Sequence, residues 1–134
     1  MEGLASLKTP FRPHGRVTAG NAAGLNDGAT GCVLAAAGTA AELGLTPKMR
    51  LVSYAFAGVD PEVMGVGPIP STERALRLAG LSIEDMGLVE INEAFAVQVL
   101  AFLSHFGIAD DDPGSTRTAA PSRSVTRWPP RGCG

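Results

Sequence analysis

Apolar positions along the chain fall into short runs that are separated by turns rich in glycine and proline. Three of these runs are short and apolar enough to predict buried strands. The segments between them carry residues that begin and end helices, and strands that alternate with helices predict an α/β architecture. In chain order, the predicted elements are a strand at 29–36, a helix at 39–43, a strand at 51–57, a helix after Ser71, a strand at 88–91 and a helix at 94–106.

Polar residues and glycines predict where the helices begin and end. Thr39 begins a capping-box spacing, and Gly44 stands where a left-handed residue ends the first helix. Ser71 is expected to cap the second helix and Gly80 to end it. Ser82 begins another capping-box spacing, which predicts one short helical turn. The predicted buried side of the second helix consists of Ala75, Leu76, Leu78 and Ala79.

The predicted helix at 94–106 is apolar around nearly its whole circumference. A helix that is apolar on every side must be buried on every side. A chain of 134 residues with a modest core cannot easily enclose such a helix. Two interpretations therefore remain: it is the central core helix of this chain, or it belongs to a multilayer α/β protein larger than this chain.

Composition and charge argue against several classes of protein. The net charge of −2 does not suit binding driven by nucleic-acid phosphates, and no apolar run approaches the ~18 residues of a membrane span. The first eight residues lack the basic and apolar regions of a signal peptide. Two cysteines are too few for a disulfide framework. We therefore expect a cytoplasmic protein without a nucleic-acid or membrane partner.

The charge changes abruptly after Asp112. Residues 1–112 hold all 13 acidic residues and seven basic ones, a net charge of −6, whereas residues 113–134 hold four arginines and no acid, a net charge of +4. The second segment has too few apolar residues to offset the entropy of ordering it, so we expect it to be disordered. It is either a natural basic tail or a stretch that is not native coding sequence.

Few residues have the chemistry of a catalytic or metal site. Cys32 lies in an apolar predicted strand, where a buried, unreactive thiol is expected, and Cys133 lies in the tail. His14 is expected on a surface loop, and His105 near a helix end, where it would interact with the terminal carbonyl groups. The three acids at 110–112 are expected to form a solvated charge run, and no metal site is predicted.

Two loops have a composition suited to a binding site. Residues 17–28 are rich in glycine and alanine, so they form either an ordinary tight turn or a place where another backbone or an extended ligand comes very close. Residues 92–95, Asn-Glu-Ala-Phe, join a predicted strand to the apolar helix, at the usual ligand edge of an α/β sheet. The Asn92 amide can either cap that helix or hold a water that polarises a carbonyl group.

At these residues the chain resembles the thiolases, the acetyl-CoA acyltransferases, over about residues 1–112. The resemblance implies that the chain is a fragment of the five-layer α/β/α/β/α thiolase fold. Residues 1–45 resemble the end of its N-terminal half, and residues 46–112 the start of its C-terminal domain. Such a fold would cover the apolar helix on every side. The segments that match in order and spacing are 11–13, 17–21, 24–29, 52–55, 58–61, 64–68 and 92–95.

The resemblance also implies roles for particular residues. Asn92 matches the asparagine that holds a water in an oxyanion hole, which makes it the one catalytic residue expected here. Ala23 stands where the family often has a serine that touches the pantetheine of coenzyme A. Coenzyme A or acyl-CoA is then substrate and partner, no cofactor or metal is expected, and the family suggests a homo-oligomer. The residues that would line the pantetheine and acyl pocket are Phe11, Ala19, Leu25, Met64, Ala94 and Phe95.

The family's covalent chemistry needs residues that this chain lacks. Thiolases use a cysteine nucleophile, a histidine in a Gly-His-Pro motif and a second cysteine that moves the α-proton. No residue here matches the nucleophile, and neither the histidine nor the second cysteine follows Asp112. A shift of one base from the Pro113 codon, however, permits a thiolase-like Gly-Gly-Ala-Ile-Ala-x-Gly-His-Pro segment, with the histidine spelled across Val125 and Thr126. This favours a frameshift over a natural basic tail.

Two functions follow as hypotheses. The first is a thiolase-type acyl-CoA acyltransferase, which cleaves or condenses 3-oxoacyl-CoA, in a truncated form that is inactive alone. The alternative is a non-catalytic module that binds a full-length thiolase subunit or coenzyme A.

Overall fold

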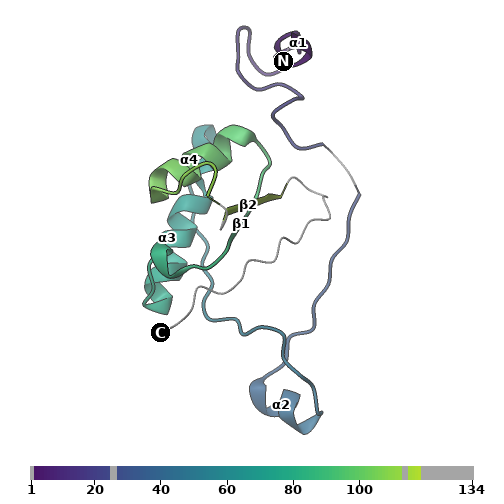
Figure 1. Cartoon of the computed structure of the whole chain (residues 1–134), viewed down its shortest axis with the longest axis vertical. Coiled ribbons are helices and arrows are strands. Elements are labelled where there is room, and N and C mark those ends of the chain that lie inside the picture. Colours follow the sequence, from purple (N-terminus) through teal and green to yellow (C-terminus); the bar gives the residue numbers. More distant parts are fainter. Residues whose placement is uncertain (1, 25–26, 113–114, 119–134) are drawn as a thin grey trace.

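The computed structural model describes residues 2–24, 27–112 and 115–118. The molecule is elongated, with α1 near one end, α2 at the tip of two long extended arms at the other end, and the packed part between them (Figure 1). The elements are α1 (Glu2–Ala5), α2 (Ala37–Glu42), the 3-10 helix η1 (Pro61–Val66), α3 (Pro68–Ala79), the 3-10 helix η2 (Ile83–Asp85), β1 (Val89–Asn92), α4 (Ala96–Phe106) and β2 (Ser115–Thr118).

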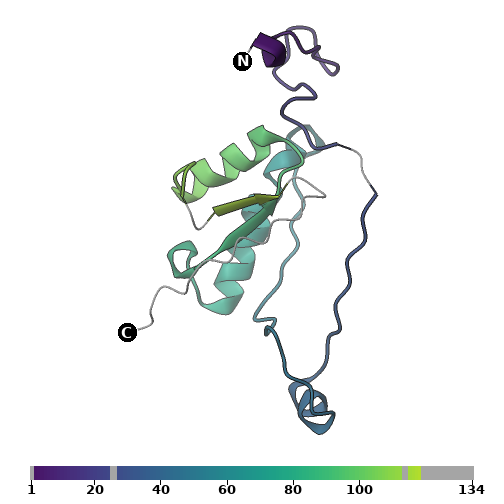
Figure 2. The same ribbon diagram turned by 45° about the vertical axis from the view of Figure 1, so that its right-hand side comes forward.

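The packed part combines a two-stranded parallel sheet with helices α3 and α4. Strands β1 and β2 lie side by side in both views (Figures 1 and 2), with Val89 opposite Ser115 and Asn92 opposite Thr118. Ile91 of β1 packs with one face of α4, and Ile69 of α3 packs against the same cluster. The mixed helix and strand composition confirms the predicted α/β class. The buried cluster consists of Ile91, Val99, Phe102 and Leu103.

Helix α4 is buried on one face only. Val99, Phe102 and Leu103 are almost completely buried, whereas Val97 is 63% exposed and Leu100 is 46% exposed. The other described residues therefore do not enclose this apolar helix. An exposed apolar helix face is typical of a surface that another layer of protein covers. The finding favours the interpretation that α4 belongs to a larger multilayer protein.

Two segments that were expected to be strands, 29–36 and 51–57, are extended but unpaired in the described structure. A strand needs a neighbouring strand for its N–H and C=O groups, and no strand among the described residues pairs with either segment. Val33 is 89% exposed and Phe56 is 80% exposed. Cys32 is likewise exposed rather than buried, because the described residues form no sheet around it. The prediction of extended backbone was sound, but the prediction of two sheet strands was wrong.

Helix α3 begins at Pro68 rather than after Ser71. Proline suits the first helical position because it has no N–H to leave unsatisfied and its φ already fits a helix. Ser71 lies inside the first turn, where its hydroxyl donates to the carbonyl of Gly67 at 3.0 Å, so its predicted capping role was wrong. Gly80 ends the helix with φ of 70°, as predicted. Leu78 is exposed, so the predicted buried side holds only for Ala75, Leu76 and Ala79, which are half-buried.

The shorter elements follow local sequence signals to different degrees. Helix α2 starts two residues before Thr39, and its N-cap makes no side-chain hydrogen bond, so the predicted capping box at Thr39 was wrong. Gly44 adopts φ of 64° just after the helix, as predicted. The capping box of Ser82 with Asp85 is formed in η2, as predicted. Helix η1 lies between the predicted strand at 51–57 and the predicted helix after Ser71, where the sequence predicted no helix.

One part of the tail is ordered. Ser115–Thr118 forms strand β2, so the expectation of disorder over 113–134 was wrong for these four residues. The remaining residues of that segment, including Cys133, lie outside the described residues.

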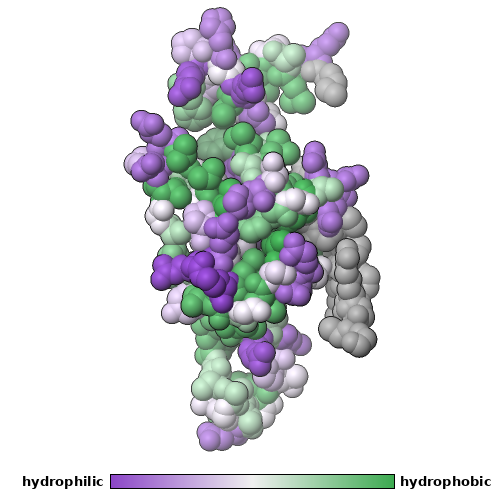
Figure 3. Space-filling model, turned by 90° about the vertical axis from the view of Figure 1, so that its left-hand side faces the viewer, coloured by the Kyte–Doolittle hydropathy of each residue, from purple (hydrophilic) through white to green (hydrophobic). Residues whose placement is uncertain are grey.

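Apolar side chains reach the surface in several places. Figure 3 views the side on which α3 and α4 lie in Figure 1, and hydrophobic side chains emerge there between hydrophilic ones. On the extended arms, Val33, Leu34, Leu51, Tyr54 and Phe56 are all exposed. Within the described part of the chain, no helix is both long enough and apolar enough to cross a membrane.

Replacement of Leu103 by alanine tests the buried face of α4. Leu103 is 1% exposed, so Leu103→Ala should lower the free energy of unfolding by about 2–5 kcal/mol through lost burial and a cavity. Leu100→Ala, on the same helix at 46% exposure, is the matched control and should cost less than about 1 kcal/mol. Urea denaturation of both variants measures the difference. Equal losses would show that the two faces of α4 are not distinguished in solution.

The capping box of η2 gives a pH-dependent prediction. Hydrogen bonds from the backbone N–H and the hydroxyl of Ser82 lower the pKa of Asp85 below its usual 3.8. Because the folded pKa lies below the unfolded one, the stabilisation is complete above the unfolded pKa and is lost as the pH falls through the folded pKa. In Ser82→Ala, the midpoint of an NMR titration of the Asp85 carboxyl should rise toward 3.8. An unchanged midpoint would assign the shift to the backbone donor alone.

The exposed apolar arms predict self-association. Monomeric proteins rarely expose apolar patches beyond a few hundred Å², so light scattering should show particles larger than a monomer. A double variant with Val33→Lys and Phe56→Lys adds charge at two highly exposed positions without touching the buried cluster, and it should shift the distribution toward monomer. A sharp monomer peak for the unmodified chain would contradict this prediction.

Candidate active site

The turn between β1 and α4 holds the residue expected to act in catalysis. Asn92 is the last residue of β1, at the carboxyl end of a parallel strand, and it is exposed. Its carbonyl accepts a hydrogen bond from the N–H of Ala94 at 3.1 Å. The N-cap of α4 is Phe95, which makes no side-chain capping bond. The interpretation of Asn92 as the side-chain cap of this helix was therefore wrong.

A second loop, residues 16–23, lies directly against this turn. Ala22 and Phe95 form an antiparallel bridge. The N–H of Ala23 donates to the carbonyl of Ala94 at 2.9 Å, and the N–H of Ala96 donates to the carbonyl of Asn21 at 3.0 Å. Of the two interpretations of the small-residue loop, close approach to another backbone is thus the one observed. Segments about 70 residues apart in sequence form one backbone unit at the start of α4.

The loop is held in shape by hydrogen bonds of its own. The Asn21 Oδ1 accepts from the N–H of Thr18 at 2.8 Å, and its Nδ2 donates to the carbonyl of Arg16 at 2.8 Å. A Cβ placed on Gly20 would lie 2.8 Å from side-chain carbons of Leu4 and Leu7, so α1 and the turn after it press against this glycine. Asn21 had no role predicted from the sequence. The available signal was an asparagine after Thr-Ala-Gly, a pattern in which the amide side chain commonly bonds nearby backbone.

Met64 lies on η1, which packs beside α4. A Cβ placed on Gly65 would lie 3.7 Å from the Cβ of Gln98 in the first turn of α4. Met64 itself is 68% exposed. The helix that carries Met64 thus borders the start of α4, where Ala94 and Phe95 also lie.

The other predicted pocket residues are placed less closely. Phe11 is 75% exposed on the N-terminal segment, and Ala19 is exposed within the loop 16–23. Leu25 lies outside the described residues. The structure therefore brings Ala23, Ala94 and Phe95 together at the Asn92 turn through backbone bonds. Their roles in binding remain predictions.

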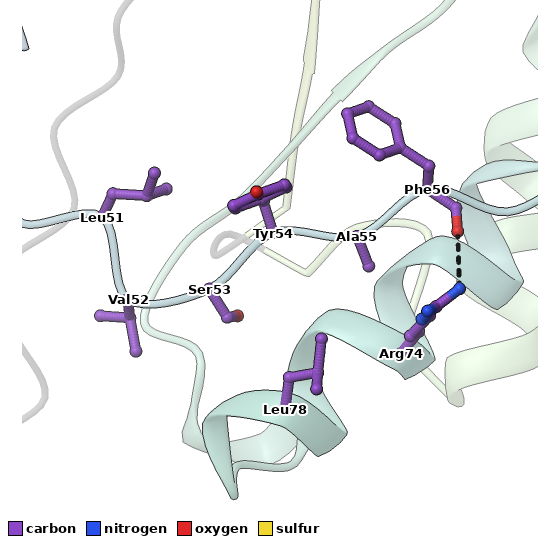
Figure 4. Close-up of a pocket in the computed structure, with 8 residues that line it drawn as sticks. All are labelled: Leu51, Val52, Ser53, Tyr54, Ala55, Phe56, Arg74 and Leu78. Carbon is purple, nitrogen blue, oxygen red and sulfur yellow. Dashed lines mark hydrogen bonds between the residues drawn. The ribbon is translucent and has the colours of Figure 1, made fainter.

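Two hollows of the described surface lie away from this turn. The one drawn in Figure 4 has a volume of about 530 Å³ and lies between residues 51–56 and the outer side of α3. In it, Ser53 donates to the carbonyl of Ala75 at 2.8 Å, and Arg74 donates to the carbonyl of Phe56 at 3.4 Å. A second hollow, of about 540 Å³, lies between residues 50–53, α3 and β1. Neither is lined by any residue predicted to bind substrate, so both mark apolar surface that the extended arm leaves uncovered.

The remaining polar candidates are structural. His105 Nε2 lies 2.8 Å from Glu73 Oε1, so it joins α4 to α3 and not to terminal carbonyls as expected. Both side chains are nearly half exposed, which makes such a pair worth little. His14 is exposed, as predicted. Among the described residues, no three His, Cys, Asp or Glu side chains gather closely enough to hold a metal ion.

Comparison with known proteins places this geometry in a family. The family profile of the thiolase C-terminal domain matches residues 45–114, and that of the thiolase N-terminal domain matches residues 1–38. The chain is 53% identical over 113 residues to 3-oxoadipyl-CoA/3-oxo-5,6-dehydrosuberyl-CoA thiolase of Escherichia coli K12, covering 84% of this chain and 28% of that protein.

Solved structures agree. The fold superimposes on the Bacillus anthracis acetyl-CoA acetyltransferase with a TM-score of 0.79 at 47% identity, over 85% of this chain and 28% of that one. It superimposes on human mitochondrial 3-ketoacyl-CoA thiolase with a TM-score of 0.74 at 39% identity, with the same coverage. The chain belongs to the thiolase family, and it spans about 28% of the length of the relatives that it matches.

Proposed function

We propose that this chain forms part of the acyl-CoA site of a thiolase-type acyltransferase, which cleaves 3-oxoacyl-CoA with coenzyme A or condenses acyl-CoA in reverse. The observation that carries the proposal is the backbone bridge between Ala22 and Phe95, next to Asn92. It joins two loops that the sequence separates, and both loops match family motifs. Support comes also from relatives named as thiolases and acetyl-CoA acetyltransferases.

Asn92 has a defined chemical task in this proposal. Its amide, at the carboxyl end of β1, would hold a water that donates to the thioester carbonyl oxygen as negative charge develops there. Ala23 and Ala94 have no side chain beyond Cβ, so an extended pantetheine arm could lie close to the backbone. Met64 and Phe95 would supply apolar contact. Coenzyme A is substrate in this scheme, and the chemistry needs no metal and no further cofactor.

We propose further that residues 1–45 and 46–112 correspond to the end of one thiolase half and the start of the other, in a cytoplasmic, homo-oligomeric enzyme. The segment 113–134 is proposed to arise from a one-base shift. The nucleotide sequence tests this directly, because its third-position bases must spell the hidden Gly-His-Pro stretch in the shifted frame. Any other bases there would leave a natural tail.

The chain is proposed to be inactive alone, since none of its residues matches the nucleophilic cysteine. Purified protein should cleave acetoacetyl-CoA in the presence of coenzyme A no faster than buffer does, because the covalent acyl transfer has no acceptor thiolate. Loss of the absorbance of the acetoacetyl-CoA enolate measures the rate, and an intact thiolase is the positive control. Cleavage above the buffer rate that Cys32→Ala abolishes would overturn the proposal.

Coenzyme A binding tests the site itself. In NMR titrations, coenzyme A should shift the amide signals of Ala23, Ala94 and Phe95 more than those of α2. Met64→Ala should raise the Kd about three- to tenfold, the effect of losing roughly 1 kcal/mol of apolar contact. Met49→Ala, a methionine at 90% exposure outside the site, is the matched control and should leave the Kd unchanged. Equal effects of the two substitutions would count against this site.

The alternative, a non-catalytic module that binds a thiolase subunit, is favoured by one observation. The exposed apolar side chains of residues 51–56 border two hollows that nothing in the described structure fills. Co-purification of the chain with a co-expressed intact thiolase, and its loss in Phe56→Lys, would support the module. Absence of co-purification would contradict the module hypothesis and leave the acyltransferase proposal as the only one of the two.

A further inference from the structure

We propose that Asn21 is a positioning residue that fixes the turn carrying Asn92. It does so through both ends of its side-chain amide and through its own carbonyl group. The inference rests on the proposed function in one respect: the positioning of the turn matters for catalysis only where Asn92 acts on an acyl group.

The first step is that Asn21 sets the shape of its own loop. Its Oδ1 accepts from the N–H of Thr18 and its Nδ2 donates to the carbonyl of Arg16, both at 2.8 Å. These are short, well-formed hydrogen bonds. Because they use opposite ends of one planar amide, they fix the direction of the Asn21 side chain relative to residues 16–18. Serine is too short to make both, and aspartate lacks the donor.

The second step is that Asn21 caps α4 from a distance. The first N–H groups of a helix have no partner within the helix, and the N-cap side chain usually supplies one. The N-cap here is Phe95, whose side chain cannot accept a hydrogen bond from these N–H groups. The carbonyl of Asn21 accepts from the N–H of Ala96, the first residue of α4, at 3.0 Å. This carbonyl, which the Asn21 amide holds in place, accepts the hydrogen bond that a serine or aspartate N-cap side chain accepts in other helices.

The third step connects Asn21 to Asn92. The neighbouring Ala23 N–H donates to the carbonyl of Ala94, whose own N–H donates to the carbonyl of Asn92 at 3.1 Å. The turn of Asn92 is thus held on its far side by two main-chain bonds from residues 21–23. Loss of the Asn21 amide would free the loop 16–23 and, with it, the turn.

Hydrogen exchange in the full chain tests the proposal without any ligand. Asn21→Ala should speed exchange of the Ala23 and Ala96 amides about tenfold, the effect of losing one to two net hydrogen bonds locally. Asn21→Asp keeps the acceptor for Thr18 but loses the donor to Arg16, so its rates should fall between those of wild type and Asn21→Ala. The amides of Phe102 and Leu103 should exchange as in wild type.

Ser82→Ala is the control for a purely structural loss, because it breaks the capping box of η2 without touching this loop. It should leave exchange at Ala23 and Ala96 unchanged. Unaltered exchange there in Asn21→Ala would overturn the proposal. Equal acceleration at Phe102 and Leu103 would also overturn it, since Asn21 would then stabilise only the fold as a whole.

Coenzyme A titration separates this inference from the proposed function. If wild type binds coenzyme A, Asn21→Ala should raise the Kd at least about threefold while Ser82→Ala leaves it unchanged. If wild type shows no binding but Asn21→Ala speeds exchange locally, the proposed function fails and the positioning of the turn stands. Binding by wild type that Asn21→Ala does not weaken would overturn the positioning role.

Discussion

The contact between Ile91 of β1 and one face of α4 is the interaction on which the described structure depends. Ile91, Val99, Phe102 and Leu103 are the buried members of the central cluster, and α3 reaches it through Ile69. Burial of such side chains contributes roughly 1.5–3 kcal/mol each. This contact holds the end of β1 against the start of α4, and the turn with Asn92 lies between the two. The geometry of the candidate site is therefore a consequence of the packing beside it.

Local signals in the sequence predicted helices more reliably than strands. Gly80 and the pair Ser82–Asp85 act on backbone within a few residues, and the structure places them as predicted. The segments 29–36 and 51–57 have the composition of strands, yet a strand exists only where a partner offers N–H and C=O groups. The amino-acid composition of a segment does not show whether a partner strand is present. Ser71 failed as a cap for a different reason, because Pro68 begins the helix earlier.

The sequence indicated which residues to place in the candidate site but not how the backbone brings their segments together. Family motifs indicated Asn92, Ala23 and Phe95. In the structure, backbone bonds join the loop that holds Ala23 to the segment that holds Phe95. The role of Asn21 was not predicted, because it depends on the hydrogen bond between its carbonyl and the N–H of Ala96. These two groups lie 75 residues apart in sequence. A pattern of residue types shows which groups are available, whereas the pairing between distant groups is known only when the chain is folded.

The parallel ladder between β1 and β2 has a consequence for which sequences can form the second strand of this sheet. The hydrogen bonds of a parallel ladder join backbone N–H and C=O groups and do not involve side chains. Any segment that lacks proline and can adopt an extended backbone can therefore pair beside β1. Ser-Thr-Arg-Thr meets that requirement, and it lies in register beside Val-Glu-Ile-Asn. Pairing beside β1 thus constrains the backbone of the second strand far more than its residue types.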